Sequence, residues 1–315
     1  MTRTRLAVTW VVLLAVWPAS AQTPEEDPPL RGYVERVEVQ LVLLHATVLN
    51  KRGEIVTDLH SGEFNLFEDG VEQEISVFGT SHDQAVKVAF LLDVSGSMAL
   101  GDRLEDAKSA IRRFVGALRP GDQIALMSFA DAGVHVEQGF TEDRFDFFQK
   151  LASLSPYGQT ALRDALVRAS SLMAEAAGSR SALILVSDGA ENASRMGKAE
   201  AVALARLVQV PIYAIGFSRL PRTLRHGIGL SPDEHAFDAL IREFTSETGG
   251  ERVLVFGPGE IDAAVRLVEE RLRGQYLIGY RPRRSSDDAG FREIALRTSR
   301  PSLQVRVRRG YVSAP

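Results

Sequence analysis

The 315-residue sequence contains no cysteine, which excludes disulfide bonds, thiolate metal ligands, a cysteine nucleophile and lipid attachment at a cysteine. It also lacks an excess of charge of either sign. The net charge is −4, so nothing in the composition points to a nucleic-acid partner. The hydrophobic share of 45% and the charged share of 25% are those of an ordinary globular protein with a sizeable core. The length allows two domains of ordinary size.

Long apolar runs are missing too, except for one at the N-terminus. Arg3 and Arg5 precede an almost wholly apolar run from Leu6 to Trp17, and Ala19-Ser20-Ala21 follows as a small-x-small cleavage site. Residues 1–21 are therefore predicted to be a signal peptide, which makes the protein periplasmic or secreted; an uncleaved anchor is the alternative. We expect no membrane insertion after cleavage. Without disulfides, the exported chain depends on its core, on bound metal, or on both.

The rest of the chain changes character twice. Residues 22–33 are a proline-containing flexible leader, and residues 34–82 carry short stretches typical of β-strands. From 85 to 274 strands and helices alternate, which predicts an α/β fold with a doubly wound, mostly parallel, Rossmann-like sheet. Residues 275–315 return to strands. Because each β flank is too short for a sandwich alone, we expect the two flanks to form one β-sandwich-like domain around the inserted α/β domain; two separate β units are the alternative.

Some local elements can also be predicted. Glu68-Asp69-Gly70 indicates a tight turn between two strands of the N-terminal flank. Val134–Phe140 is predicted to pair antiparallel with the preceding strand at an edge of the sheet. The segment from Arg219 to His235 has neither helical nor strand periodicity and predicts a polar loop of undefined role, followed by a helix over Phe237–Thr248.

The first strand of the α/β region ends in oxygen-bearing side chains. An apolar run from Val86 to Leu92 predicts a strand buried on both faces, and Asp93, Ser95 and Ser97 follow it at alternate positions. Open α/β sheets bind their ligands at the carboxyl ends of their strands. Alternate residues of an extended loop point the same way, so this short segment can present several hard oxygen ligands, which suit Mg²⁺ or Mn²⁺ rather than Zn²⁺.

Two further polar residues occur at strand–helix junctions of the same region. Thr160 precedes a predicted helix, and Asp188 directly follows the predicted strand Ser181–Val186. We expect both loops at the sheet edge that carries Asp93. Each residue alone also fits a helix N-cap or a turn, but the whole set in this order favours a metal site.

The pattern Asp93-x-Ser95-x-Ser97, Thr160 and Ser187-Asp188-Gly189 resembles the metal-ion-dependent adhesion site (MIDAS) of von Willebrand factor type A (VWA) domains. The resemblance covers roughly residues 85–274, and the flanks resemble those of bacterial exported proteins that carry this domain. It departs from integrin-type domains after the loop, where Met98 is followed by no pair of acids, so a second, adjacent ion is not expected.

The resemblance implies a ligand set and a function. Ser95, Ser97 and often Thr160 would ligate Mg²⁺, or Mn²⁺ or Ca²⁺, directly, while Asp93 and Asp188 would bind it directly or through water. The protein would then be no enzyme but an adhesion- or scaffold-type module, whose ion takes an Asp or Glu carboxylate of a protein partner.

Two other functions are weighed against this one. A Mg²⁺-dependent phosphatase of the haloacid-dehalogenase type would use Asp93 as its nucleophile, but that chemistry expects a second acid at the position of Ser95. The other alternative is a metal-binding structural scaffold in an envelope complex. A phosphate-binding loop is excluded, because Ala199 stands after Lys198 where Ser or Thr is needed. The sequence does not identify the partner.

Overall fold

A computed structural model of the protein describes residues 41–80, 84–131, 133–173, 180–189, 191–205, 210–217, 232–283 and 290–313. All of them belong to one compact unit, Val39–Pro315. The predicted signal peptide (1–21) and flexible leader (22–33) lie outside the described residues.

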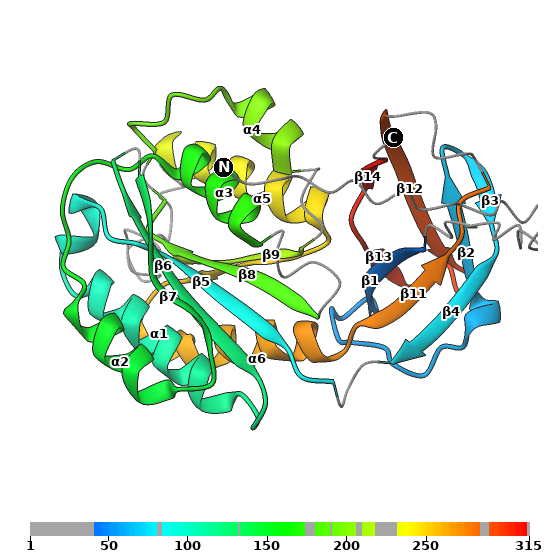
Figure 1. The fold of residues 1–315 in the computed structure, drawn as a ribbon, viewed down its shortest axis with the longest axis horizontal. Coiled ribbons are helices and arrows are strands. Elements are labelled where there is room, and N and C mark those ends of the chain that lie inside the picture. The colour runs from blue at the N-terminus through cyan, green and yellow to red at the C-terminus, as the bar shows by residue number, and fades with distance from the viewer. Residues whose placement is uncertain are drawn as a thin grey trace, which may run out of the picture. The chain divides into compact units, whose positions relative to one another are not determined.

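A six-stranded sheet forms the centre of the α/β part (Figure 1), in the order β10-β9-β8-β5-β6-β7. Its strands are β5 (Lys87–Asp93), β6 (Gln123–Ala130), β7 (Gly133–Thr141), β8 (Ser181–Ser187), β9 (Ile212–Phe217) and β10 (Arg252–Val255). All neighbours pair parallel except β7, which runs antiparallel to β6 at the edge. The prediction of a doubly wound, mostly parallel sheet with an antiparallel edge strand is confirmed.

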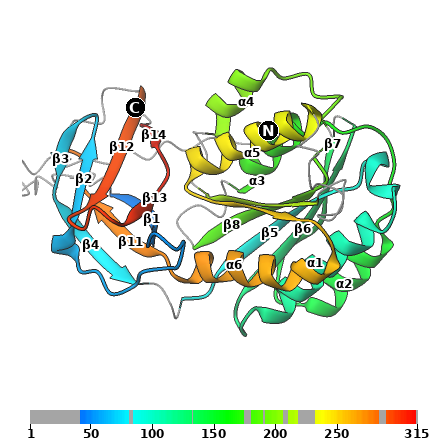
Figure 2. The ribbon, with the colours of Figure 1, turned by 180° about the vertical axis from the view of Figure 1, so that it is seen from behind.

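Helices cover both faces of this sheet (Figures 1 and 2). Phe90 and Leu92 of β5 pack in one core cluster with α1 (Arg103–Ala117), α2 (Arg144–Ser153) and α6 (Ile261–Arg273). Ala89 and Leu91 face the other way, in a second cluster with α3 (Leu162–Leu172), α4 (Lys198–Ala205) and α5 (Pro232–Thr248). The central strand β5 is therefore buried on both faces, which explains its uninterrupted apolar sequence.

Helix α5 corrects one local prediction. It begins at Pro232, whereas the sequence predicted a polar loop up to His235 and a helix from Phe237. Proline is tolerated in the first turn of a helix, since the N–H that it lacks would have no partner within the helix. The prediction counted this proline as a loop signal. The earlier part of the predicted loop lies outside the described residues.

The β flanks build two four-stranded antiparallel sheets, β13-β1-β11-β4 and β14-β12-β2-β3. The strands are β1 (Val42–Leu49), β2 (Phe64–Glu68), β3 (Val71–Gln73), β4 (Ile75–Thr80), β11 (Tyr276–Tyr280), β12 (Gly290–Thr298), β13 (Gln304–Arg306) and β14 (Gly310–Ser313). Each sheet combines strands from both ends of the chain. Both sheets contribute to a single hydrophobic core, which includes Leu44, Leu66, Tyr276 and Leu296. The expected β-sandwich-like domain made from both flanks is thus confirmed.

A buried ion pair joins the two flanks inside the core of the β-sandwich-like domain. Glu68 at the end of β2 accepts hydrogen bonds from Arg292 Nη1 at 2.9 Å, from the Tyr280 hydroxyl at 2.5 Å and from the Tyr311 hydroxyl at 3.0 Å. The side chains of Glu68 and Arg292 are each only 2% exposed. One acid from the N-terminal flank therefore satisfies polar groups of three C-terminal strands.

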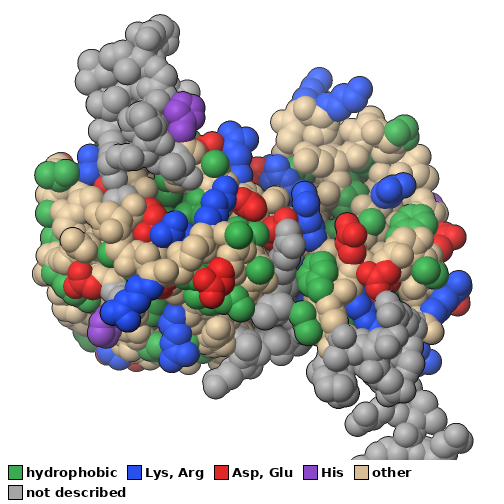
Figure 3. All heavy atoms as spheres, turned by 90° about the horizontal axis from the view of Figure 1, so that it is seen from above, with side chains coloured by type: hydrophobic (Ala, Val, Ile, Leu, Met, Phe, Trp, Pro, Cys, Tyr) green, Lys and Arg blue, Asp and Glu red, His purple; other side chains and the backbone are tan. Residues whose placement is uncertain are grey.

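The surface agrees with the balanced composition. On the face drawn in Figure 3, basic and acidic side chains are interspersed. No helix in the described ranges is both long and apolar enough to span a membrane.

Candidate metal centre

The polar residues that follow β5 lie at the carboxyl edge of the six-stranded sheet. Asp93 is the last residue of the strand, and Ser95 caps a short 3₁₀ turn, Gly96–Ala99, that contains Ser97. Asp93 and Ser95 are fully buried. The Ser95 amide donates to Asp93 Oδ1 at 2.9 Å, and the hydroxyl oxygens of Ser95 and Ser97 lie 3.0 Å apart. The two hydroxyls are thus presented side by side.

Strand β8 delivers a second pair of polar residues to the same place. It pairs parallel with β5, with Val186 opposite Leu92, so the residues after both strands are neighbours. Ser97 Oγ donates to Asp188 Oδ1 at 3.0 Å, and Ser187 Oγ donates to Asp93 Oδ2 at 2.6 Å. Asp188 is only 3% exposed. Asp93 is therefore held by the last residue of β8, and Asp188 by a serine of the loop after β5.

Thr160 reaches this group through the backbone of its loop. The Tyr157 amide donates to the Val94 carbonyl at 2.7 Å, and the Gly96 amide donates to the Gly158 carbonyl at 3.0 Å. Thr160 itself is 1% exposed. The structure thus joins Asp93, Ser95, Ser97 and Asp188 by side-chain hydrogen bonds, and it places the Thr160 loop directly against theirs.

The close approach of the two loops depends on glycines. A Cβ at Gly96 would lie 3.0 Å from the Gly158 carbonyl oxygen. Gly158 has a φ of +67°, and a Cβ there would lie 2.5 Å from Asp131 Oδ2. Asp131, just after β6, accepts a hydrogen bond from the Gln159 amide at 2.7 Å and donates its own amide to the Gln159 carbonyl at 2.6 Å. Asp131 thereby anchors the Thr160 loop to the end of β6.

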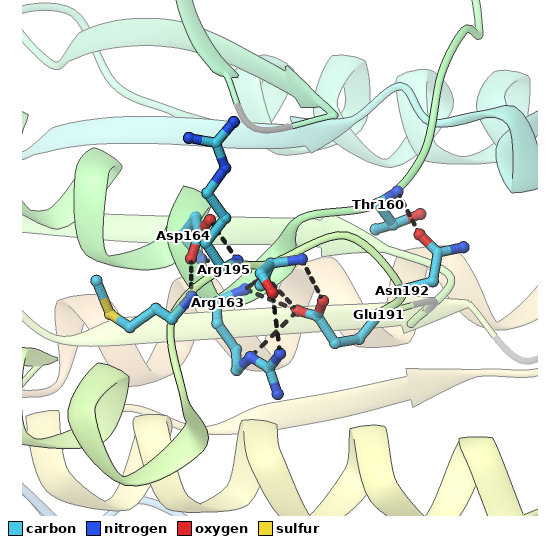
Figure 4. A network of polar contacts seen from close by, with 8 residues as sticks. Thr160, Arg163, Asp164, Glu191, Asn192 and Arg195 are labelled. Carbon is cyan, nitrogen blue, oxygen red and sulfur yellow. Dashed lines mark hydrogen bonds and ion pairs between the residues drawn. The ribbon is translucent and has the colours of Figure 1, made fainter.

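A further polar network fixes Thr160 to the loop after β8 (Figure 4). The Thr160 amide donates to Asn192 Oδ1 at 2.9 Å. Glu191 accepts from the Ser194 hydroxyl at 2.7 Å and from the Arg163 amide, in the first turn of α3, at 3.0 Å. The chain following Asp188 is in this way held against the start of the helix that follows Thr160.

Arg103, the first residue of α1, contacts the group from its outer side. Its Nη1 donates to Asp188 Oδ2 and to the Ser97 carbonyl, both at 3.0 Å. The sequence interpretation did not include this residue. A signal for it was present, because a basic side chain in the first turn of a helix opposes the helix dipole and so calls for a partner outside the helix.

The electrostatics of Asp93 favour a cation at this point. Burial, together with a smaller effect of the Asp188 charge, raises the pKa of Asp93 to about 6, although hydrogen bonds from Ser187 and Ser95 act in the opposite direction. None of these influences is a cation. Because a buried carboxylate requires a compensating positive charge to stay ionised, a divalent ion beside the serine hydroxyls would supply what Asp93 needs.

The donor set also limits which ion fits. The described residues contain no group of three or more His, Cys, Asp or Glu side chains that could hold a metal. The candidate centre offers two carboxylates and several hydroxyls, all of them hard oxygen donors. Mg²⁺ is commonly held by one or two carboxylates while it keeps several waters, so the residues present fit Mg²⁺ or Mn²⁺.

Comparison with known proteins agrees with the fold. Residues 88–191 match the family model described as the von Willebrand factor type A domain, so the resemblance seen in the sequence is confirmed over this segment. That segment contains all five candidate residues. No curated protein matches the sequence.

Several solved structures resemble the chain. The structure described as von Willebrand factor type A from Catenulispora acidiphila is 14% identical, with a TM-score of 0.51, over 89% of this chain and 64% of that one. Proximal thread matrix protein 1 from the mussel byssus is 19% identical, with a TM-score of 0.50, over 65% of this chain and 51% of that one. An aerotolerance-related membrane protein from Bacteroides fragilis is 22% identical, with a TM-score of 0.47, over 60% and 98%. At these identities the likeness concerns the fold.

Proposed function

We propose that this protein is an exported, non-enzymatic protein-binding module, which uses a divalent cation to ligate an Asp or Glu carboxylate of a partner. One observation carries the proposal. Asp93, Ser95, Ser97 and Asp188 form one hydrogen-bonded group at the carboxyl edge of the sheet, with the Thr160 loop packed against it. The match of residues 88–191 to the von Willebrand factor type A domain supports it. Export rests on the predicted signal peptide.

The roles of the residues follow from their chemistry. Ser95 and Ser97 would offer uncharged oxygens, Thr160 a third, and the two carboxylates would balance the charge of the ion. When bound, the ion supplies a Lewis-acidic position that attracts an anionic oxygen. Since so few protein ligands are charged, positions held by water remain exchangeable for a partner carboxylate.

The burial of Asp93 argues against the phosphatase alternative. A nucleophile must present an oxygen to its substrate, yet Asp93 is 0% exposed. Its Oδ1 accepts from the Ser95 amide and its Oδ2 from the Ser187 hydroxyl. Ser95 occupies the position where that chemistry needs a second acid. Turnover of a panel of phosphate esters that disappears in Asp93→Ala would restore the phosphatase alternative.

Thermal unfolding with and without Mg²⁺ or Mn²⁺ tests the ion. An ion that binds only the folded state stabilises it by about 2.7 kcal/mol at one hundred times its Kd, which for a chain of this size corresponds to an increase in Tm of about 4 °C. We expect this increase in the wild type and its loss in Asp93→Ala and Asp188→Asn. An equal, EDTA-reversible increase in wild type and Asp93→Ala would contradict the site.

Asp122→Asn is the matched control. Asp122 is a buried acid (4% exposed) just before β6, at the opposite edge of the sheet, where it pairs with Arg273. Its loss should lower the Tm but leave the increase caused by Mg²⁺ intact.

Affinity capture from an envelope extract, in Mg²⁺ against EDTA, then tests for a partner. If the ion has only a structural role, the protein should capture the same partners in EDTA as in Mg²⁺, as long as it stays folded in EDTA.

A further inference from the structure

We propose that Arg103 sets the charge of the ion site: it lowers the affinity for the divalent ion and in return makes the loaded site cationic toward an acidic partner. This inference rests on the proposed function and adds to it a residue outside the Asp-x-Ser-x-Ser pattern. It concerns how the site divides its electrostatic attraction between ion and partner.

The contacts of Arg103 place it behind Asp188. Asp188 turns Oδ1 toward the Ser97 hydroxyl and Oδ2 toward Arg103 Nη1, each at 3.0 Å. The guanidinium therefore binds the carboxylate oxygen that faces away from the serines. The Asp188 side chain is 0% exposed and that of Arg103 is 18% exposed. Because the carboxylate does not contact solvent, salt and water weaken the attraction between the two charges less than at an exposed ion pair. Arg103 also donates to the Ser97 carbonyl at 3.0 Å, which ties it to the ion loop itself.

A count of charges gives the consequence. Within the hydrogen-bonded group itself, the ionised carboxylates of Asp93 and Asp188 offset the charge of a divalent ion, so this group without Arg103 would be neutral when loaded. With Arg103 the loaded site carries one net positive charge, and the empty site only one net negative charge. The arginine thus weakens the attraction for the ion and creates an attraction for an anion that exists only when the ion is bound.

Arg103 also lines a cavity beside the ion site. Both hydrogen bonds that it makes to described residues use Nη1. The side chain lines a cavity of about 340 Å³, together with Phe217 and Val255 from the carboxyl ends of β9 and β10 and with the acids Asp102 and Asp106 at the start of α1. The cavity is thus at the same edge of the sheet as the ion site. A carboxylate that reached the ion with one oxygen could be held at its other oxygen by the remaining N–H groups, which a planar guanidinium does better than an ammonium.

Calorimetric titration of the full chain with Mn²⁺ tests the effect on the ion. Arg103→Gln should bind Mn²⁺ at least about tenfold more tightly than the wild type, because one repelling charge is removed. Arg103→Lys keeps the charge and should remain near the wild-type affinity. Arg113→Gln is the matched control, since Arg113 lies on the same helix and pairs with the exposed Asp262; it should leave Mn²⁺ binding unchanged.

A carboxylate probe tests the effect on the partner. Acetate titrated into the Mn²⁺-loaded protein should lower the water-proton relaxation caused by the bound Mn²⁺, as coordinated water is displaced. Arg103→Gln should require several-fold more acetate than the wild type for the same change. Loosening of the site would weaken the binding of both Mn²⁺ and acetate. Tighter binding of Mn²⁺ together with weaker binding of acetate therefore indicates the loss of the arginine charge.

The outcomes separate this inference from the proposed function. If the wild type does not bind Mn²⁺, both are overturned. If the wild type binds Mn²⁺ but Arg103→Gln binds it equally or more weakly, Arg103 only orients Asp188 and this inference alone is overturned. The same holds if Arg103→Gln binds acetate as well as the wild type does.

Discussion

Replacing Gly158 by alanine tests whether the close approach of the Thr160 loop is essential. Gly158 has a φ of +67°, and an added Cβ would lie 2.5 Å from Asp131 Oδ2. Gly121 provides a matched control: its φ is +86°, and an added Cβ would meet nothing within 4 Å. Both substitutions impose the same kind of backbone strain, but only Gly158→Ala also displaces a neighbouring side chain.

The difference between the two variants can be estimated. An L-residue in the left-handed region costs about 1–2 kcal/mol, and this applies to both glycines. At Gly158 the Asp131 carboxylate must also move, which breaks its hydrogen bond from the Gln159 amide. A hydrogen bond to a charged group contributes about 1.5–3 kcal/mol. We therefore expect Gly158→Ala to lower the free energy of unfolding by about 2.5–5 kcal/mol and Gly121→Ala by about 1–2 kcal/mol.

Urea denaturation of both variants, with the slope m unchanged, gives these free energies. Calorimetry with Mn²⁺ adds a functional measurement: Gly158→Ala should weaken binding, because its carbonyl holds the Gly96 amide of the ion loop at 3.0 Å, whereas Gly121→Ala should not. Equal destabilisation by the two variants would refute the argument from the Asp131 contact. Unchanged Mn²⁺ affinity in Gly158→Ala would refute the role of the loop in the site.

Two further predictions concern the β-sandwich-like domain. Glu68→Gln leaves the buried Arg292 without its carboxylate and should lower the free energy of unfolding by about 3–5 kcal/mol in urea, whereas the exposed Glu293→Gln should change it by less than about 0.5 kcal/mol. Burial and two nearby arginines lower the pKa of His45 from 6.5 to about 4. The unfolded chain therefore takes up a proton at higher pH than the native one, so the wild type should lose about 2 kcal/mol more than His45→Gln between pH 7.5 and pH 5. Parallel stability curves for the two proteins would contradict the neutral state of His45 in the native protein.

Much of the fold could be predicted because its determinants are local. The uninterrupted apolar run of β5 is explained by burial on both faces, and the polar residues after it mark the end of the strand. The tight turn at Asp69-Gly70 was recognised from its sequence and does separate β2 from β3. The predicted start of α5 at Phe237 was wrong for a local reason too: the helix begins at Pro232, and proline signals either a loop or a first helical turn.

The residues that the sequence did not identify act across long stretches of chain. Glu68 was part of a turn signal, but its ion pair with Arg292 joins residues far apart in sequence and depends on the pairing of β2 with β12. Ser187 belongs to the sequence pattern, but its hydrogen bond to Asp93 could not be predicted, because it depends on the register between β8 and β5. Asp131 and Arg103 likewise acquire their contacts from the arrangement of three separate loops. A pattern at fixed spacing cannot report such contacts, because it contains no information on register.

The absence of cysteine gives the proposed ion a second consequence. Asp93 and Asp188 come from loops that follow adjacent strands, and the charge of Asp188 raises the pKa of Asp93, so the two acids repel each other across the carboxyl edge of the sheet. A divalent ion between them would turn this repulsion into a link between the loops after β5 and β8 and, through Thr160, the start of α3. In a chain without disulfides, binding of the ion and stability of this edge of the sheet would then be one equilibrium. For that reason ion-dependent stability and ion-dependent partner binding should be lost together in Asp188→Asn, but should separate in Arg103→Gln, which keeps both carboxylates.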